Sequence, residues 1–226
     1  MDLEIYLRSM ERSREYRVAK WVAWKLFQDH GILFAPKQLL SWGPGESPVT
    51  DQLYDKIQET RDFFDRLQDE CLTIIDGPTN PTGIWEHQKE IAKRNGTISK
   101  PNDVEVEYDP YNEDKMVVYI LDHIGAVRSE RGYSKKQKLD KTSEYMQESR
   151  DKFGFMNVAV NQFNRSLGDS LRRKGTVEPE KQDFKGSGNM YEDADAAVAL
   201  FNPHEYHMDT NLGYEIGKFV TTEGFN

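Results

Sequence analysis

Apolar runs of strand length alternate along the chain with segments whose apolar residues recur at helical spacing. This alternation predicts an α/β fold with a mostly parallel sheet and crossover helices. We expect strands at residues 4–10, 72–75, 116–121, 157–160, 196–201 and 214–220. We expect helices at 13–31, 50–70, 82–96 and 136–153. Ser13 is the expected cap of the first helix, and Gly31 ends it.

Three segments break this alternation and are typical of loops. Residues 41–48 hold two glycines and two prolines, which supply turn dihedrals and deny backbone donors. Residues 101–115 carry six acidic side chains and are expected to form a solvated insertion. Residues 165–185 hold six basic and four acidic side chains around two glycines and a proline, which predicts a long mobile loop. Residues 1–226 are thus expected to be a single domain with these additions.

Composition and charge narrow the class of protein. Hydrophobic residues make up 37% of 226, enough for a core. No apolar run approaches the roughly 20 residues that span a bilayer, and the amino terminus lacks the pattern of a signal peptide, so we expect a soluble intracellular protein. The single Cys71 cannot form an internal disulfide. With a net charge of -9, any surface that binds DNA must be a local basic patch.

Asp122 is the first candidate for chemistry. It follows the apolar run 116–121 and has the form of a Walker B aspartate, whose carboxylate projects towards the magnesium ion of a nucleotide, directly or through a water molecule. A structural aspartate at a strand end is the alternative. The companion Walker A sequence, Gly-x-x-x-x-Gly-Lys-Ser/Thr, does not occur in the chain.

Two motifs in the second half of the chain resemble DnaB-like replicative DNA helicases. Residues 158–167, Val-Ala-Val-Asn-Gln-Phe-Asn-Arg-Ser-Leu, resemble that family's strand followed by Ser-Gln-Leu-Asn-Arg-Ser. Residues 183–195, Asp-Phe-Lys-Gly-Ser-Gly-Asn-Met-Tyr-Glu-Asp-Ala-Asp, resemble its Asp-Leu-Arg-Glu-Ser-Gly-Ser-Ile-Glu-Gln-Asp-Ala-Asp segment. Upstream, residues 6–15 resemble the strand that ends in Ser-Leu-Glu-Met-Ser-Arg-Glu, and 122–124 resemble Asp-Tyr-Leu. The resemblance runs from Tyr6 to Phe201.

The resemblance implies a RecA-like P-loop NTPase core, with a mostly parallel twisted sheet flanked by helices. It implies part of an ATP-driven motor that translocates on single-stranded DNA and unwinds duplex at the replication fork. The cofactors of the intact protein would be ATP and Mg²⁺, and the assembly a homo-hexamer. Primase or a helicase loader is an expected partner, and no membrane is. The diverged motifs favour a phage origin and hence the host cytoplasm.

Three residues receive roles in hydrolysis from this resemblance. Glu11 matches the glutamate that polarises the attacking water, Asp122 the magnesium-associated aspartate, and Gln162 the sensor of the γ-phosphate. Phosphoryl transfer needs positioning and charge neutralisation, which such groups supply. The alternatives are that Glu11 only favours the start of a helix and that Gln162 is a hydrogen-bonding residue at a strand end.

A second group of residues is assigned to DNA by the same resemblance. Lys185, Gly186 and Gly188 match the loop that holds DNA phosphates, although lysine replaces the family's arginine and Gly186 its glutamate. Backbone amides at the two glycines can contact phosphates as well. The neighbouring basic residues are Arg165, Arg172, Arg173 and Lys174. Without the family match, a solvated basic face would be the simpler interpretation.

The chain differs from DnaB-like helicases in two ways that leave other functions open. The family's first strand and P-loop precede the part that matches Tyr6, and its basic Lys-x-Arg segment follows the last strands, so we expect a partial motor domain that is inactive by itself. A RecA-like recombinase or related ATPase is one alternative. A non-catalytic pseudo-ATPase that binds DNA or assembles into a ring is another.

Overall fold

A computed structural model describes residues 2–40, 51–100, 106–163, 179–180, 183, 188–206, 208, 210–211 and 214–215. The chain divides into two units, Met1–Asn161 and Gln162–Asn226, and each is described by itself. The expected loop at 41–48 and most of the expected basic loop lie outside the described residues.

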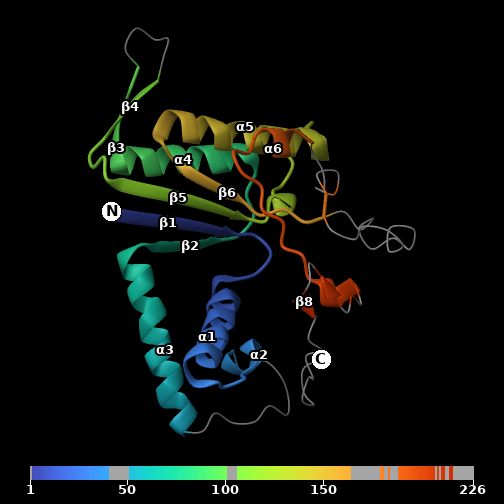
Figure 1. The fold of residues 1–226 in the computed structure, drawn as a ribbon. Helices are drawn as coiled ribbons and strands as arrows, with labels where there is room; N and C mark the ends of the chain where they lie inside the picture. Colours follow the sequence, from blue (N-terminus) through green and yellow to red (C-terminus); the bar gives the residue numbers. More distant parts are fainter. Residues whose placement is uncertain are drawn as a thin grey trace. The chain divides into compact units, whose positions relative to one another are not determined.

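A four-stranded parallel sheet forms the centre of the first unit, in the order β2-β1-β5-β6 (Figure 1). Its strands are β1 (Asp2–Ser9), β2 (Leu72–Asp76), β5 (Lys115–Asp122) and β6 (Met156–Ala159). Ser9 is in register with both Asp76 and Asp122. The carboxyl ends of β2, β1 and β5 therefore lie level at one edge of the sheet.

Helices cover both faces of this sheet (Figure 1). One face is covered by α1 (Arg14–His30) and α3 (Asp51–Glu70), and the other by α4 (Pro81–Asn95) and α5 (Lys135–Phe153). A short helix, α2 (Pro36–Leu39), follows α1. On the α1 face, Leu7, Leu72 and Ile74 are buried in one cluster with Trp21 packed against it. None of these helices, within the residues described, is long and apolar enough to cross a membrane.

Local capping explains where the helices start and stop. Ser13 caps α1 by accepting a hydrogen bond from the Tyr16 amide, and Gly31 ends that helix with φ 65°, a left-handed conformation that glycine adopts without a Cβ penalty. Both were predicted. Helix α4 begins one residue earlier than predicted, at Pro81, because Asn80 accepts a hydrogen bond from the Gly83 amide at 2.7 Å.

An antiparallel pair of strands borders the acidic segment. Strand β3 (Gly96–Ser99) pairs with β4 (Glu107–Pro110), which lies inside the range 101–115 that we expected to be a solvated insertion. Residues 101–105 lie outside the described part. The sequence analysis did not predict this strand, because β4 contains acidic side chains and few apolar residues. Its positions alternate between exposed and half-buried.

The second unit contains short elements only, among its described residues. These are α6 (Gly188–Glu192), a 3-10 turn at Pro203–Tyr206, and the antiparallel pair β7 (Thr210–Asn211) and β8 (Tyr214–Glu215). The strand predicted at 196–201 is wrong: these residues have no ladder, and Val198 and Leu200 are 83% and 88% exposed. Apolar composition indicates a tendency to be buried, but a strand forms only where a neighbour supplies ladder hydrogen bonds.

Candidate functional site

The ends of the two central strands meet at the carboxyl edge of the sheet. The amide of Met10, just after β1, donates to the carbonyl of Asp122 at 3.0 Å. The amide of Ile124, just after β5, donates to the carbonyl of Val160 at 3.0 Å. The segments that follow β1, β5 and β6 are thus hydrogen-bonded to one another, so side chains on them are held at fixed relative positions.

The carboxylate of Asp122 forms an ion pair with Arg17 from the first part of α1. Arg17 Nη2 lies 2.7 Å from Asp122 Oδ2, and the two side chains are 18% and 28% exposed. Parallel strands followed by helices place the start of α1 beside the strand end. The ion pair therefore links β5 to α1 at the edge of the sheet.

The carboxylate of Glu11 contacts the residue next to Asp122. His123 Nε2 lies 2.7 Å from Glu11 Oε1, with the histidine side chain 11% and the glutamate side chain 53% exposed. The peptide bond between Asp122 and His123 is cis. A Cβ atom on Gly125 would lie 2.8 Å from two atoms of the His123 ring, so glycine at 125 leaves the space that the ring occupies.

The third carboxylate at this edge, Asp76, has a structural role. It ends β2 and its Oδ2 accepts a hydrogen bond from the backbone amide of Arg14 at 3.1 Å. The amide belongs to the first turn of α1, where backbone donors lack partners within the helix and negative charge is favourable.

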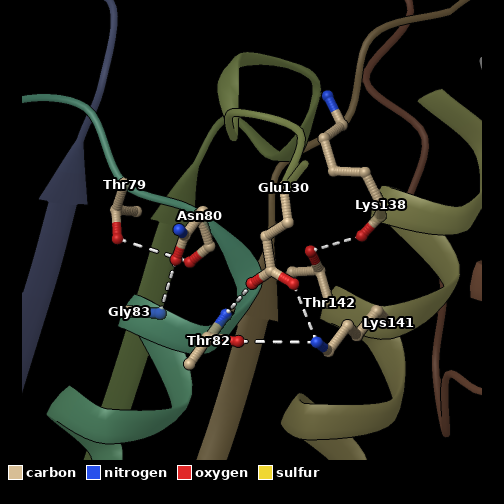
Figure 2. Close-up of polar contacts among 8 residues, drawn as sticks. All are labelled: Thr79, Asn80, Thr82, Gly83, Glu130, Lys138, Lys141 and Thr142. Atoms are coloured by element: carbon tan, nitrogen blue, oxygen red, sulfur yellow. Dashed lines mark hydrogen bonds and ion pairs between the residues drawn. The ribbon is translucent and has the colours of Figure 1, made fainter. Parts of the chain in front are cut away.

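The loop that carries His123 is fixed by a clamp of charged residues (Figure 2). Glu130 accepts a hydrogen bond from the Thr82 amide at 2.9 Å and pairs with Lys141 Nζ at 2.8 Å. Figure 2 shows the Glu130 carboxylate between the first turn of α4 and helix α5. On the same side of α5, Lys138 Nζ donates to the carbonyl of Gly125 at 3.1 Å.

The charges in this clamp shift the pKa values of its members. Hydrogen bonds from Lys141 and then Thr82 lower the pKa of Glu130 to about 2. The same hydrogen bond with Glu130 raises the pKa of Lys141. Burial lowers the pKa of Lys138, with a smaller contribution from the charge of Lys135. Glu130 is therefore a stable carboxylate at neutral pH and anchors the loop after β5.

Of the residues predicted for hydrolysis, the structure brings two together. Glu11 and Asp122 lie at the ends of adjacent strands, while Gln162 belongs to the second unit, whose placement relative to the first is not described. A half-exposed carboxylate such as Glu11 can accept a proton from a water molecule. The arrangement can therefore support acid–base chemistry next to Asp122.

Most residues predicted for DNA contact lie outside the described part of the chain. These are Arg165, Arg172, Arg173, Lys174, Lys185 and Gly186. Gly188 is described and begins α6. Their assignment to DNA remains a prediction from the sequence.

Several residues of the site were missed by the sequence analysis, among them Ser9, Arg17 and His123. Ser9 lies near the end of the predicted strand 4–10 and His123 shortly after the predicted strand 116–121, so their positions in the sequence could have singled them out. Arg17 could not be found in this way, because nothing in a helix pattern shows that a guanidinium turns back onto the preceding sheet.

The fold has been seen before in helicases. A solved structure described as a DnaB-like replicative helicase and its interactions with primase superposes with a TM-score of 0.59 over 86% of this chain, at 13% sequence identity. The structure of the ATPase domain of a phage helicase superposes with the same TM-score over 86% of this chain, at 15% identity. This chain has the fold of a helicase ATPase domain. The predicted resemblance to DnaB-like helicases and the predicted RecA-like fold are confirmed.

The chain matches only part of each of these two proteins. It spans 40% of the DnaB-like helicase chain and 57% of the phage helicase chain. No protein-family model matches the sequence, and no curated protein matches it either.

Helicases of this fold imply Mg²⁺, and the residues of the edge can be tested against it. Magnesium takes oxygen ligands in octahedral geometry. Here Asp122 Oδ2 is already in contact with a guanidinium, and the described residues contain no group of three or more histidine, cysteine or carboxylate side chains that could hold a metal. In the conformation observed, the edge does not fit a directly bound Mg²⁺.

Proposed function

We propose that this chain is part of the ATP-driven motor domain of a replicative DNA helicase that translocates on single-stranded DNA and unwinds duplex at the replication fork. One observation carries the proposal. Glu11 and Asp122 lie at adjacent strand ends of a sheet that shares its fold with helicase ATPase domains.

The proposed roles follow the positions of these residues. Glu11 activates the attacking water, because its carboxylate is half exposed and is oriented by His123. Asp122 is the carboxylate that associates with magnesium through a water molecule in the intact protein. Gln162, after β6, senses the γ-phosphate, and the basic segment 165–185 contacts DNA.

Cofactors and partners are part of the same proposal. The intact protein uses ATP and Mg²⁺, assembles as a homo-hexamer and binds single-stranded DNA in the host cytoplasm. Primase is a proposed partner, since one of the two helicases of similar fold is described with its interactions with primase. A helicase loader is the alternative partner.

A non-catalytic DNA-binding or ring-assembly module is the second candidate. It is favoured by the lack of a Gly-x-x-x-x-Gly-Lys-Ser/Thr sequence in the chain and by the contact of Arg17 with Asp122. A RecA-like recombinase is a further alternative, which the helicase-like motifs at 158–167 and 183–195 oppose.

The chain by itself provides the first test. We expect neither micromolar ATP affinity in titration calorimetry with Mg²⁺ nor phosphate release with single-stranded DNA, because P-loop amides and one lysine supply most of the hold on a triphosphate. Micromolar affinity or multiple turnovers would mean that these residues build a phosphate cradle of their own. Residues 41–50 would then be the first to examine.

A protein in which a Walker A segment is joined ahead of this chain provides the decisive test. Glu11→Gln should abolish phosphate release while nucleotide affinity stays within about twofold, because a base that activates water acts mainly in the transition state. Glu15→Gln, an exposed glutamate one turn further along, is the matched control and should leave turnover unchanged. Near-normal turnover of Glu11→Gln would contradict the proposed role.

A further inference from the structure

Arg17 is held by two partners at the edge of the sheet. Besides the ion pair with Asp122 at 2.7 Å, its Nε and Nη2 donate to Ser9 Oγ at 3.1 and 2.8 Å. Ser9 is fully buried at the end of β1. The guanidinium therefore contacts the ends of both central strands at once.

Ser9 itself is fixed, which sets the direction of the guanidinium. Its hydroxyl donates to the carbonyl of Arg12 at 2.9 Å, so its lone pairs face Arg17. A planar guanidinium with a fixed fork of donors loses little freedom when several acceptors match it. The position of Arg17 against Asp122 is thus determined by the sheet, and not by the ion pair alone.

We propose that Arg17 is the resident counter-ion of Asp122, and that this chain holds no divalent cation at that carboxylate while Arg17 is in place. The proposal rests on the proposed function only for the importance of Asp122. A divalent cation at Asp122 would lie within a few ångströms of the guanidinium, where two positive charges repel strongly. The guanidinium also occupies Oδ2 with a charge-assisted hydrogen bond.

This geometry makes Arg17 and a divalent cation compete for the carboxylate of Asp122. A cation and Arg17 cannot both neutralise Asp122, so the affinity of the carboxylate for metal depends on whether α1 keeps its guanidinium in place. Removing the charge of Arg17 should therefore raise the affinity of Asp122 for a divalent cation, which is the opposite of what removing a ligand does.

Mn²⁺ titration of the full chain, followed by electron paramagnetic resonance of the free ion, tests the proposal. The isotherms of the wild type and of Asp122→Asn should coincide. Arg17→Met should bind Mn²⁺ at Asp122 at least about tenfold more tightly than the wild type does. Adding Asp122→Asn to Arg17→Met should remove that site, and excess Mg²⁺ should compete for it.

Two further variants make the result unambiguous. Lys25→Met removes another α1 cation that is paired with a carboxylate, Asp29, at 2.8 Å, and should gain no site that depends on Asp122. Arg17→Gln keeps a donor for Ser9 without the charge, and serves if Arg17→Met does not fold. A wild-type site that Asp122→Asn abolishes would overturn the proposal, and that comparison needs no Arg17 variant. Folded Arg17 variants that bind no more Mn²⁺ than the wild type would overturn it as well.

The titration contains neither nucleotide nor DNA. Its outcome is therefore separate from the proposed motor function, which calorimetry with ATP and phosphate release address. A chain that lacks ATPase activity in every context can still show competition between Arg17 and metal, and an active motor can still lack it.

Discussion

His123 Nε2 lies 2.7 Å from Glu11 Oε1 and joins the segments that follow the two central strands of the sheet. The histidine is almost buried and the carboxylate is half exposed. The mostly buried ring holds one oxygen of the carboxylate, while the Glu11 side chain as a whole stays half exposed to water.

The contact depends on the space left by Gly125. A Cβ at this position would lie 2.8 Å from the His123 ring, so Gly125→Ala should force the ring to move and destabilise the chain by about 1–3 kcal/mol. Urea unfolding measures the loss of stability. Nitrogen-15 spectra of the imidazole should show that the His123 resonances shift as its contact with Glu11 changes.

A double-mutant cycle separates this clash from a general effect on the loop. In the background of His123→Ala, the ring is absent, and Gly125→Ala should cost less than half as much as in the wild type. Equal costs in the two backgrounds would show that the ring does not determine the choice of glycine at position 125.

Acid should weaken the clamp of Glu130 and Lys141. The pKa of Glu130 is lowered from its ordinary value of 4.5 to about 2, so its contribution to stability is complete above pH 4.5 and is lost as the pH falls towards 2. Glu130→Gln should cost about 1–3 kcal/mol at pH 7, because the carboxylate is well shielded and its removal leaves Lys141 without its partner. Denaturation at pH 7, 5 and 3 measures the difference between the two proteins.

The difference should shrink as the pH falls, since the wild type loses the charge that the variant lacks at every pH. Glu86→Gln is the matched control: its ion pair with Lys89 on the surface of α4 is exposed, and such pairs contribute little to stability. A constant difference between Glu130→Gln and the wild type from pH 7 to pH 3 would refute the assignment of this acid-sensitive contribution to Glu130.

His87 should make the first unit sensitive to acid at a higher pH. Burial against the sheet, with added repulsion from Arg8 and Arg94, lowers its pKa from 6.5 to about 4. In the unfolded chain His87 binds a proton below about pH 6.5, but in the folded chain it does so only below about pH 4. The free energy of unfolding therefore falls as the pH decreases from 6.5 to 4. The free energy of unfolding should decrease by on the order of 1 kcal/mol over this range, allowing for the partial exposure of the ring.

His87→Gln removes this titration and should flatten the pH dependence of the free energy of unfolding between pH 6.5 and 4. The expected change is specific to the ring that contacts Tyr6 and Tyr119 between α4 and the sheet. His30→Gln, at the end of α1, is the control. If both variants keep the wild-type slope, the burial of His87 does not control stability in this range.

Much of the first unit could be predicted from periodicity, because each predicted element has a cap or a buried run of its own. Ser13 and Gly31 delimit α1, and the apolar run at 116–121 coincides with β5. The run at 196–201 is as apolar but forms no strand. A strand needs a hydrogen-bonded neighbour, and a single segment of sequence cannot specify one.

The candidate site was predictable only in part, for a similar reason. Glu11 and Asp122 follow strands, so topology alone places them at one edge. Their partners come from packing: the guanidinium of Arg17 reaches back from α1, and Gly125 makes room for His123. Such contacts are set by side-chain directions in three dimensions, which periodicity does not encode.

Binding of single-stranded DNA should depend on salt through the basic segment 165–185. This segment holds six basic and four acidic side chains in a chain of net charge -9, so it is a local region of positive charge. Replacing Arg172, Arg173 and Lys174 together by alanine should weaken binding and flatten the slope of log affinity against log salt by about 2, since each lost phosphate contact removes roughly 0.7 on single strands. Fluorescence anisotropy of a labelled oligonucleotide over a range of salt concentrations measures both quantities.

The matched control removes the same charge elsewhere. Lys20, Arg66 and Lys93 are exposed on α1, α3 and α4, and their joint replacement by alanine makes the same change in net charge. If the segment 165–185 contacts the DNA phosphates directly, this control should change the affinity only slightly. It should leave the slope of log affinity against log salt as in the wild type, because only cations that neutralise phosphates release counterions. If both triple variants lower the slope equally, overall charge and not the segment 165–185 governs binding, and the DNA role assigned to that segment fails.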